Sequence, residues 1–254
     1  MPFRLTRSVK FLLISCFAAF VIQQTGDQFF GTHLLTLFAL VPSGFVLEHR
    51  FWQLFTYAFL HGDVMHLFLN LFILVFIGAE LETLWGTSRF LKYYFTCSIS
   101  AGILYLLLQI FLWGGDGLYT PMLGASGGIY GLLLAYGLIF GERVFLFMLL
   151  FPMKAKHFVW VLALVEFMTT LFSGRAGLAS AAHLGGMFAG FVYLWTRATW
   201  SLLKKRRALK SSQMPEKLRE TKKNPGHLKL IVDNERKLNK DAWSDSDQDP
   251  KTWH

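Results

Sequence analysis

The feature that most constrains this chain is a series of long apolar segments separated by short polar stretches. Each segment is close to the roughly 20 residues that an α-helix needs to cross about 30 Å of hydrocarbon. Hydrophobic residues make up 54% of the chain and charged residues only 16%, which is little polar surface for a water-soluble domain of 254 residues. The sequence therefore predicts an all-α integral membrane protein.

Six segments are candidate transmembrane helices. They are residues 8–24, 64–84, 90–112, 125–141, 157–173 and 179–200. A signal peptide is an alternative for residues 1–24, but the Gln-Gln-Thr-Gly that follows lacks a small-x-small cleavage site, so a retained helix is favoured. The next apolar run is interrupted by Pro42 and Gly44 and is expected to form an interfacial or partly re-entrant loop.

The distribution of Lys and Arg predicts the orientation of these helices. Basic residues precede the first span, lie in alternate loops and follow the last span in large excess, whereas the opposite loops hold only Arg50 and Arg175. Because positive charge concentrates in cytoplasmic loops, both termini are expected in the cytoplasm. The loops at 25–63, 113–124 and 174–178 then face outward.

Residues 201–254 differ in character from the rest and hold 14 Lys or Arg and 8 Asp or Glu. We expect a cytoplasmic tail, disordered or only locally helical, that follows a membrane domain of residues 1–200. Its KKRR sequence at 204–207 follows a span directly, where each basic residue gains about 1 kcal/mol from anionic headgroups. The lipid bilayer is therefore an expected partner, and nucleic acid is not.

The two cysteines, Cys16 and Cys97, both lie inside predicted spans. Neither has a metal-ligand spacing or belongs to a disulfide framework, so both are interpreted as buried apolar thiols. No metal or other cofactor is expected.

A few strongly polar side chains lie inside the predicted spans, where an ionised group costs about 2.5–3.5 kcal/mol and a functional role is the first interpretation. They are His61, Asp63, His66, Asn70, Ser126, Glu166 and His183. Spans two, four and six all run inward from the outer side, which places His66, Asn70, Ser126 and His183 at a similar outer depth. Each alone fits a cap or a packing residue, but their joint occurrence at one depth favours a site.

Residue spacing indicates which groups share a helix face. His66 and Asn70 are four residues apart, as are Ser126 and Tyr130. Small residues let membrane helices approach closely, and glycines line the fourth and sixth spans at positions 127, 131, 186 and 190. Packing of these two spans is expected to bring His183 near Ser126.

These residues fit the requirements of acyl transfer. A serine hydroxyl needs a base to accept its proton, and an imidazole is the usual base near neutral pH; Ser126 and His183 fit these roles. His66, Asn70 and the main-chain N–H of Ser126 are candidate oxyanion donors. Glu166 is an alternative orienting group for His183, but a carboxylate there is expected to be neutral, so a Ser-His dyad is favoured.

Three motifs carry a resemblance to a known family. GASG at 124–127, HGDVMHLFLN at 61–70 and AHLGGMFAG at 182–190 resemble the GxSG, HxxxxHxxxN and AHxxGxxxG motifs of the rhomboid intramembrane serine proteases. Further similarity in FWQLFTYAFLH and GAELETLWG extends the resemblance over nearly all of residues 8–200.

The resemblance implies a six-helix rhomboid bundle with a water-filled cavity open to the outer face. Ser126 would be the nucleophile, His183 the general base, and His66 and Asn70 the oxyanion-hole side chains. Gly124 would match the motif glycine before the nucleophile, and the ring of Tyr130 would pack on the histidine. Substrates would be membrane proteins cut within or near a transmembrane helix.

One residue departs from the family pattern, because Gln53 follows Trp52 where many members have Arg. This leaves the hydrogen bonding of the first outer loop open. Two other functions also stay open: an inactive rhomboid-like protein that escorts membrane proteins, which loss of Ser or His would favour, and a transporter, which would show internal repeats. The expected location is a bacterial inner membrane, since no organelle-targeting pattern is evident.

Overall fold

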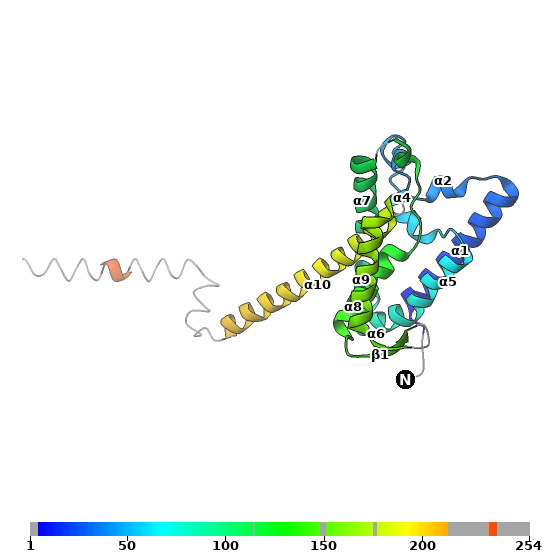
Figure 1. The fold of residues 1–254 in the computed structure, drawn as a ribbon. Coiled ribbons are helices and arrows are strands. Elements are labelled where there is room, and N and C mark those ends of the chain that lie inside the picture. Colours follow the sequence, from blue (N-terminus) through cyan, green and yellow to red (C-terminus); the bar gives the residue numbers. More distant parts are fainter. Residues whose placement is uncertain (1–4, 114, 148–150, 175–176, 213–233, 238–254) are drawn as a thin grey trace, which may run out of the picture. The chain divides into compact units, whose positions relative to one another are not determined.

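The computed structural model describes residues 5–113, 115–147, 151–174, 177–212 and 234–237. The chain divides into two units, Met1–Thr196 and Arg197–His254. Figure 1 shows the fold, and all residues of the candidate site lie in the first unit.

Within the described residues, five helices are long and apolar enough to cross a membrane. They are α1 (Arg7–Thr25), α5 (Val64–Ile73) continued through a π-helical turn into α6 (Ala79–Trp85), α7 (Thr87–Leu108), α9 (Ala155–Phe172) and α10 (Gly177–Ser212). A shorter apolar helix, α8 (Ser126–Ile139), completes the six. The predicted all-α membrane architecture is confirmed.

Helix α8 packs against both α7 and α9 (Figure 1). Its 14 residues give a length of roughly 21 Å, which is less than the about 30 Å of hydrocarbon in a bilayer. A helix this short cannot reach both boundaries of the hydrocarbon layer. One of its ends therefore lies at membrane depth.

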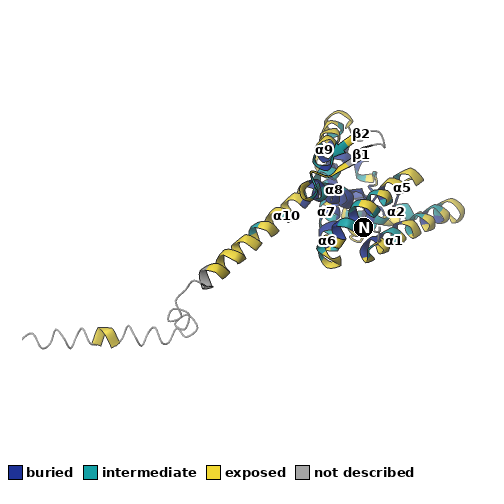
Figure 2. Ribbon diagram, turned by 90° about the horizontal axis from the view of Figure 1, so that it is seen from below, coloured by how far each residue is buried: buried dark blue, intermediate teal, exposed yellow. Residues whose placement is uncertain are grey.

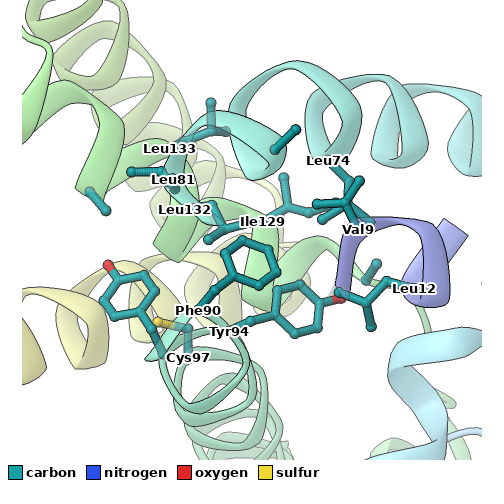
Figure 3. Close-up of a cluster of buried hydrophobic side chains, with 14 of the residues drawn as sticks. Val9, Leu12, Leu74, Leu81, Phe90, Tyr94, Cys97, Ile129, Leu132 and Leu133 are labelled. Atoms are coloured by element: carbon teal, nitrogen blue, oxygen red, sulfur yellow. The ribbon is translucent and has the colours of Figure 1, made fainter. Parts of the chain in front are cut away.

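The buried core is centred on α7 and α8. Figure 3 shows a cluster in which Phe90 and Tyr94 of α7 lie against Ile129 and Leu132 of α8 and Leu12 of α1. Large apolar side chains elsewhere face outward, and exposed positions cover much of the helical surface in Figure 2. This arrangement suits a protein whose outer surface is solvated by lipid.

The predicted close approach of spans four and six, which are α8 and α10, is present, and it occurs at Gly186. A side chain at Gly186 would overlap the main-chain oxygen of Gly127. The other glycines face α7 more directly: a Cβ at Gly127 would lie 2.7 Å from that of Ala101, and Gly131 abuts Cys97. Gly127, Gly128 and Gly131 thus let α8 pack closely on α7, and the main chain of Gly127 contacts α10 at Gly186.

The loop between α1 and α5 contains the short helices α2 (Leu34–Phe38), α3 (Pro42–Val46) and α4 (Gln53–Thr56). The fully buried Gln53 holds the loop together. Its Oε1 accepts from the main-chain N–H of Val41 at 3.1 Å, and its Nε2 donates to the carbonyl oxygen of Thr36 at 3.1 Å. Glutamine here therefore supplies both a donor and an acceptor.

A two-stranded antiparallel hairpin joins α8 to α9. Strand β1 (Val144–Phe147) pairs with β2 (Phe151–Lys154), with Val144 opposite Lys154. The sequence predicts only a loop between the spans 125–141 and 157–173. Strands of four residues are too short for their alternation to stand out between two apolar spans.

Helix α10 continues past the predicted start of the tail at residue 201 and ends at Ser212. The first part of the predicted tail is therefore helical, because no Gly or Pro interrupts residues 191–212. The rest of the predicted tail lies outside the described residues, apart from a short helix at 234–237.

Candidate active site

Ser126 is the first residue of α8 and is 8% exposed. The chain enters this helix through Gly124, which has a φ of +121°, a conformation that side chains other than glycine rarely adopt. A Cβ at Gly124 would also lie 2.8 Å from Cε1 and 2.9 Å from Nε2 of His66. Glycine is thus needed at position 124 both for the turn and to leave space for the His66 ring.

His183 on α10 faces Ser126. Its Nε2 lies 2.8 Å from the Ser126 Oγ, a hydrogen-bond distance. The ring of Tyr130, one turn along α8, stacks on the imidazole with centroids 4.2 Å apart and planes within 8°. The structure therefore brings together the three residues that the sequence analysis placed on these two helices.

Glu166 of α9 lies on the opposite edge of the imidazole. Its Oε1 is 3.3 Å from the His183 Nδ1 and also accepts a hydrogen bond from the Tyr130 hydroxyl. The His183 Nδ1 is close enough to the Glu166 Oε1 for charge pairing, but the two atoms do not meet hydrogen-bond geometry. Among the described residues, the buried Nδ1 and the Glu166 Oε2 have no hydrogen-bond partner.

The two candidate residues on α5 are held by their own helix. The Asp63 carboxylate accepts from the main-chain N–H of His66 at 2.8 Å and caps α5. The Asn70 Nδ2 donates to the main-chain oxygen of His66 at 2.9 Å. Since an amide nitrogen has two N–H groups, Asn70 keeps one donor beyond this bond.

His61 was not among the predicted site residues, although it begins the HGDVMHLFLN motif. Its ring is fully buried and lies 5.1 Å from the His66 ring in an edge-on arrangement. Burial, with a smaller effect of His66, lowers the pKa of His61 to about 4. The imidazole is therefore neutral near pH 7 and is suited to packing behind His66.

Cys16 and Cys97 are free and buried, as interpreted from the sequence. Over the part of the chain that the structure describes, no group of three His, Cys, Asp or Glu side chains could hold a metal ion.

The fold and the site together define a class: a polytopic helical membrane protein with a buried serine hydroxyl paired to a histidine. Comparison with known proteins agrees with this class. A model of the Rhomboid domain matches residues 48–200, more than half of the chain. The chain belongs to the rhomboid family.

Several named relatives are similar to this chain. "Rhomboid protein 1, mitochondrial" of Saccharomyces cerevisiae is 32% identical over 144 residues, which are 54% of this chain and 39% of that protein. Rhomboid protease GluP of Bacillus subtilis is 24% identical over 190 residues, 73% of this chain and 34% of its own length. Rhomboid-like protease 3 of Toxoplasma gondii is 29% identical over 141 residues, 56% of this chain and 49% of that protein. The matches thus span less than half of each relative.

Proposed function

We propose that this protein is an intramembrane serine endopeptidase that cleaves peptide bonds in or near the transmembrane segments of other membrane proteins. The observation that carries the proposal is the 2.8 Å separation between the Ser126 Oγ and the His183 Nε2 in a helical membrane bundle. Two of the similar proteins are named proteases, which supports the same reaction.

In the proposed reaction the Ser126 Oγ attacks the carbonyl carbon of the scissile bond while its proton passes to the His183 Nε2. The carbonyl oxygen takes up the electron pair and becomes an oxyanion. When this intermediate collapses, the C–N bond breaks and the Nε2 proton moves to the departing amine. Ser126 is left as an acyl ester, and the first product leaves with a new amino terminus.

Water completes the cycle. His183 accepts a proton from the water as its oxygen attacks the ester carbonyl, and then returns that proton to Ser126 when the C–O bond breaks. The second product leaves as a carboxylic acid. His66 beside Gly124, the free N–H of Asn70 and the main-chain N–H of Ser126 are the proposed oxyanion donors, each worth about 2.7–4 kcal/mol by analogy with other enzymes.

The proposed orientation follows from the basic loops, with both termini in the cytoplasm and Ser126 toward the outer face. In that orientation the inner end of α8 lies at the cytoplasmic boundary and its first residue below the outer surface. Water and substrate would reach the serine from the outer side. A bacterial inner membrane stays a prediction from the sequence, and one similar protein is named mitochondrial.

The second candidate function is an inactive rhomboid-like protein that binds and escorts membrane proteins. The retained Ser126, His183 and stacked Tyr130 favour the enzyme, because an escort protein needs no polar pair buried at hydrogen-bond distance. A measurement of serine reactivity distinguishes the two.

Labelling by a fluorophosphonate probe in detergent or liposomes provides this test. Wild-type protein is expected to label, and Ser126→Ala to lose the label and all cleavage of a single-span model substrate, because no other group carries the acyl ester. Ser98→Ala is a matched control, since Ser98 is also a buried serine in a span but lies on α7. Equal labelling of wild type and Ser126→Ala would show that the nucleophile is wrongly assigned.

A further inference from the structure

The helix α9 buries only three residues among those described, Ala155, Val159 and Glu166. The first two lie in its first half. In its second half Glu166 is 7% exposed, while Val165 and Phe167 on either side of it are 54% and 48% exposed. A carboxylate thus occupies the one buried position in that half-helix, where an apolar side chain would be expected in a membrane protein.

Glu166 meets two aromatic rings from two other helices. Tyr130 of α8 and His183 of α10 stack in parallel planes, and the phenol hydroxyl donates to the Glu166 Oε1. The same oxygen is 3.3 Å from the His183 Nδ1. A carboxylate oxygen has two lone pairs and can accept from both rings.

The position of this acceptor bears on which imidazole nitrogen carries the proton. A neutral imidazole has one N–H, and Nε2 can take the Ser126 proton only when that N–H is on Nδ1. An acceptor beside Nδ1 favours this tautomer. Ser126 can then donate to the free lone pair of Nε2 across 2.8 Å.

We propose that Glu166 is a positioning residue that holds His183 in the Nδ1-protonated tautomer and stabilises the imidazolium formed when Ser126 loses its proton. This inference rests on the proposed function. The Nδ1 proton stays on the ring throughout, and Glu166 touches neither the substrate nor the reacting atoms. Ser126, His183 and Glu166 would then form a Ser-His-Glu arrangement contributed by α8, α10 and α9, respectively.

The other groups that face His183 cannot take this role. Tyr130 covers the ring face and Ser126 occupies Nε2. His66 of α5 also interacts electrostatically with His183, but it carries no negative charge. Among the described residues around this ring, Glu166 is the carboxyl group that lies beside Nδ1, and in this role it is ionised, contrary to the neutral group expected from the sequence.

The test compares Glu166→Gln with Glu82→Gln. Glutamine keeps the volume of the side chain and an oxygen for Tyr130 but removes the charge. Glu82 is also a buried carboxylate in a span, 3% exposed, yet its partners belong to the start of α1 and to Thr87, not to the site. For each variant we would measure kcat and KM on a single-span substrate, the folded fraction and the thermal midpoint.

For Glu166→Gln the expected result is a fall in kcat of about 10- to 100-fold with KM unchanged to within about threefold, since the group acts through the base. Glu82→Gln is expected to lower the thermal midpoint but leave kcat per folded molecule unchanged. Three outcomes would overturn the proposal: wild-type kcat in folded Glu166→Gln, a change confined to KM, or a loss that matches the unfolded fraction.

A measurement on the wild-type protein covers the case in which Glu166→Gln does not fold. After phosphonylation of Ser126, the His183 Nδ1 proton should give a low-field NMR signal from a hydrogen-bonded imidazolium, and absence of that signal overturns the proposal. The fluorophosphonate result separates the two ideas. If wild type does not react, the proposed function fails and this inference with it, whereas equal reactivity of wild type and Glu166→Gln removes only the role of Glu166.

Discussion

Two buried glutamates, one in the span α5–α6 and one in α9, show how differently this bundle uses the same side chain. Glu82 and Glu166 are 3% and 7% exposed. Glu82 is surrounded by hydrogen-bond donors, whereas Glu166 accepts from the Tyr130 hydroxyl through Oε1, lies near the side chains of His183 and Ser180, and has an Oε2 with no hydrogen-bond partner among the described residues. The hydrogen-bonding capacity of the carboxylate is therefore used fully at Glu82 and only in part at Glu166.

Glu82 provides the cap that α1 lacks at its own start. The Thr6 side chain makes no cap to its own helix and donates to Glu82 instead. The main-chain N–H groups of Ser8 and Val9 donate to the same carboxylate at 3.0–3.1 Å, and Thr87 donates at 2.7 Å. Free N–H groups at a helix start favour a negative charge, so this contact stabilises the fold.

Glu166 leaves its Oε2 and the nearby His183 Nδ1 without hydrogen bonds within the described part of the chain. Unsatisfied buried polar groups are destabilising, and natural proteins tend to retain them where function requires them. The comparison thus sets a carboxylate that caps a helix beside one that we propose positions the base.

The largest effect is expected from His183→Ala, which removes the proposed base next to Glu166. Cleavage of a single-span substrate should fall by about 10⁴-fold or more, because Ser126 would have no group to accept its proton. The variant should still fold and insert, as judged by size-exclusion profile and thermal midpoint. Turnover near the wild-type rate would rule out the Ser-His pair as the reacting groups.

A smaller loss is expected from His66→Ala and from Asn70→Ala. Each should lower kcat by about 10²–10³-fold, since one proposed oxyanion donor is lost and the others persist. Phe68→Ala on the same helix is the control, because Phe68 is 57% exposed on the surface of α5. If His66→Ala or Asn70→Ala behaved like this control, that residue would have no part in oxyanion binding.

The smallest effect on turnover is expected from substitution of Glu82, the carboxylate that accepts several hydrogen bonds. Glu82→Ala should lower the free energy of unfolding by about 2–4 kcal/mol, because several donors at the start of α1 lose a charged acceptor. The value of kcat per folded molecule should stay unchanged. A fall in kcat with unchanged stability would contradict the distinction drawn between the two glutamates.

Much of the fold could be predicted from the sequence because hydropathy and spacing are local properties. The six spans were predicted within a few residues, apart from the last, where α10 continues to Ser212. The roles of Ser126, His183, His66 and Asn70 stay predictions. Their motifs identified them as candidates, and the structure shows how the main chains of Gly127 and Gly186 let two of their helices meet.

Other features could not be read from the sequence. Gln53 departs from the family pattern, yet its amide accepts from the N–H of Val41 and donates to the carbonyl oxygen of Thr36 in the loop between α1 and α5, because an amide can donate and accept at once. The hairpin of β1 and β2 was missed because its strands are only four residues long. For Gln53 the outcome depended on partners 12 and 17 residues away in the chain.

The sequence by itself determined the membrane class, the family and a set of candidate polar residues, since each follows from composition or from motifs within single helices. Only the tertiary structure decided which carboxylate faces the histidine. Glu166 and His183 lie on successive helices, and their contact depends on the rotation of α9 and α10 about their axes. That rotation is set by packing across the whole bundle, which no local pattern records.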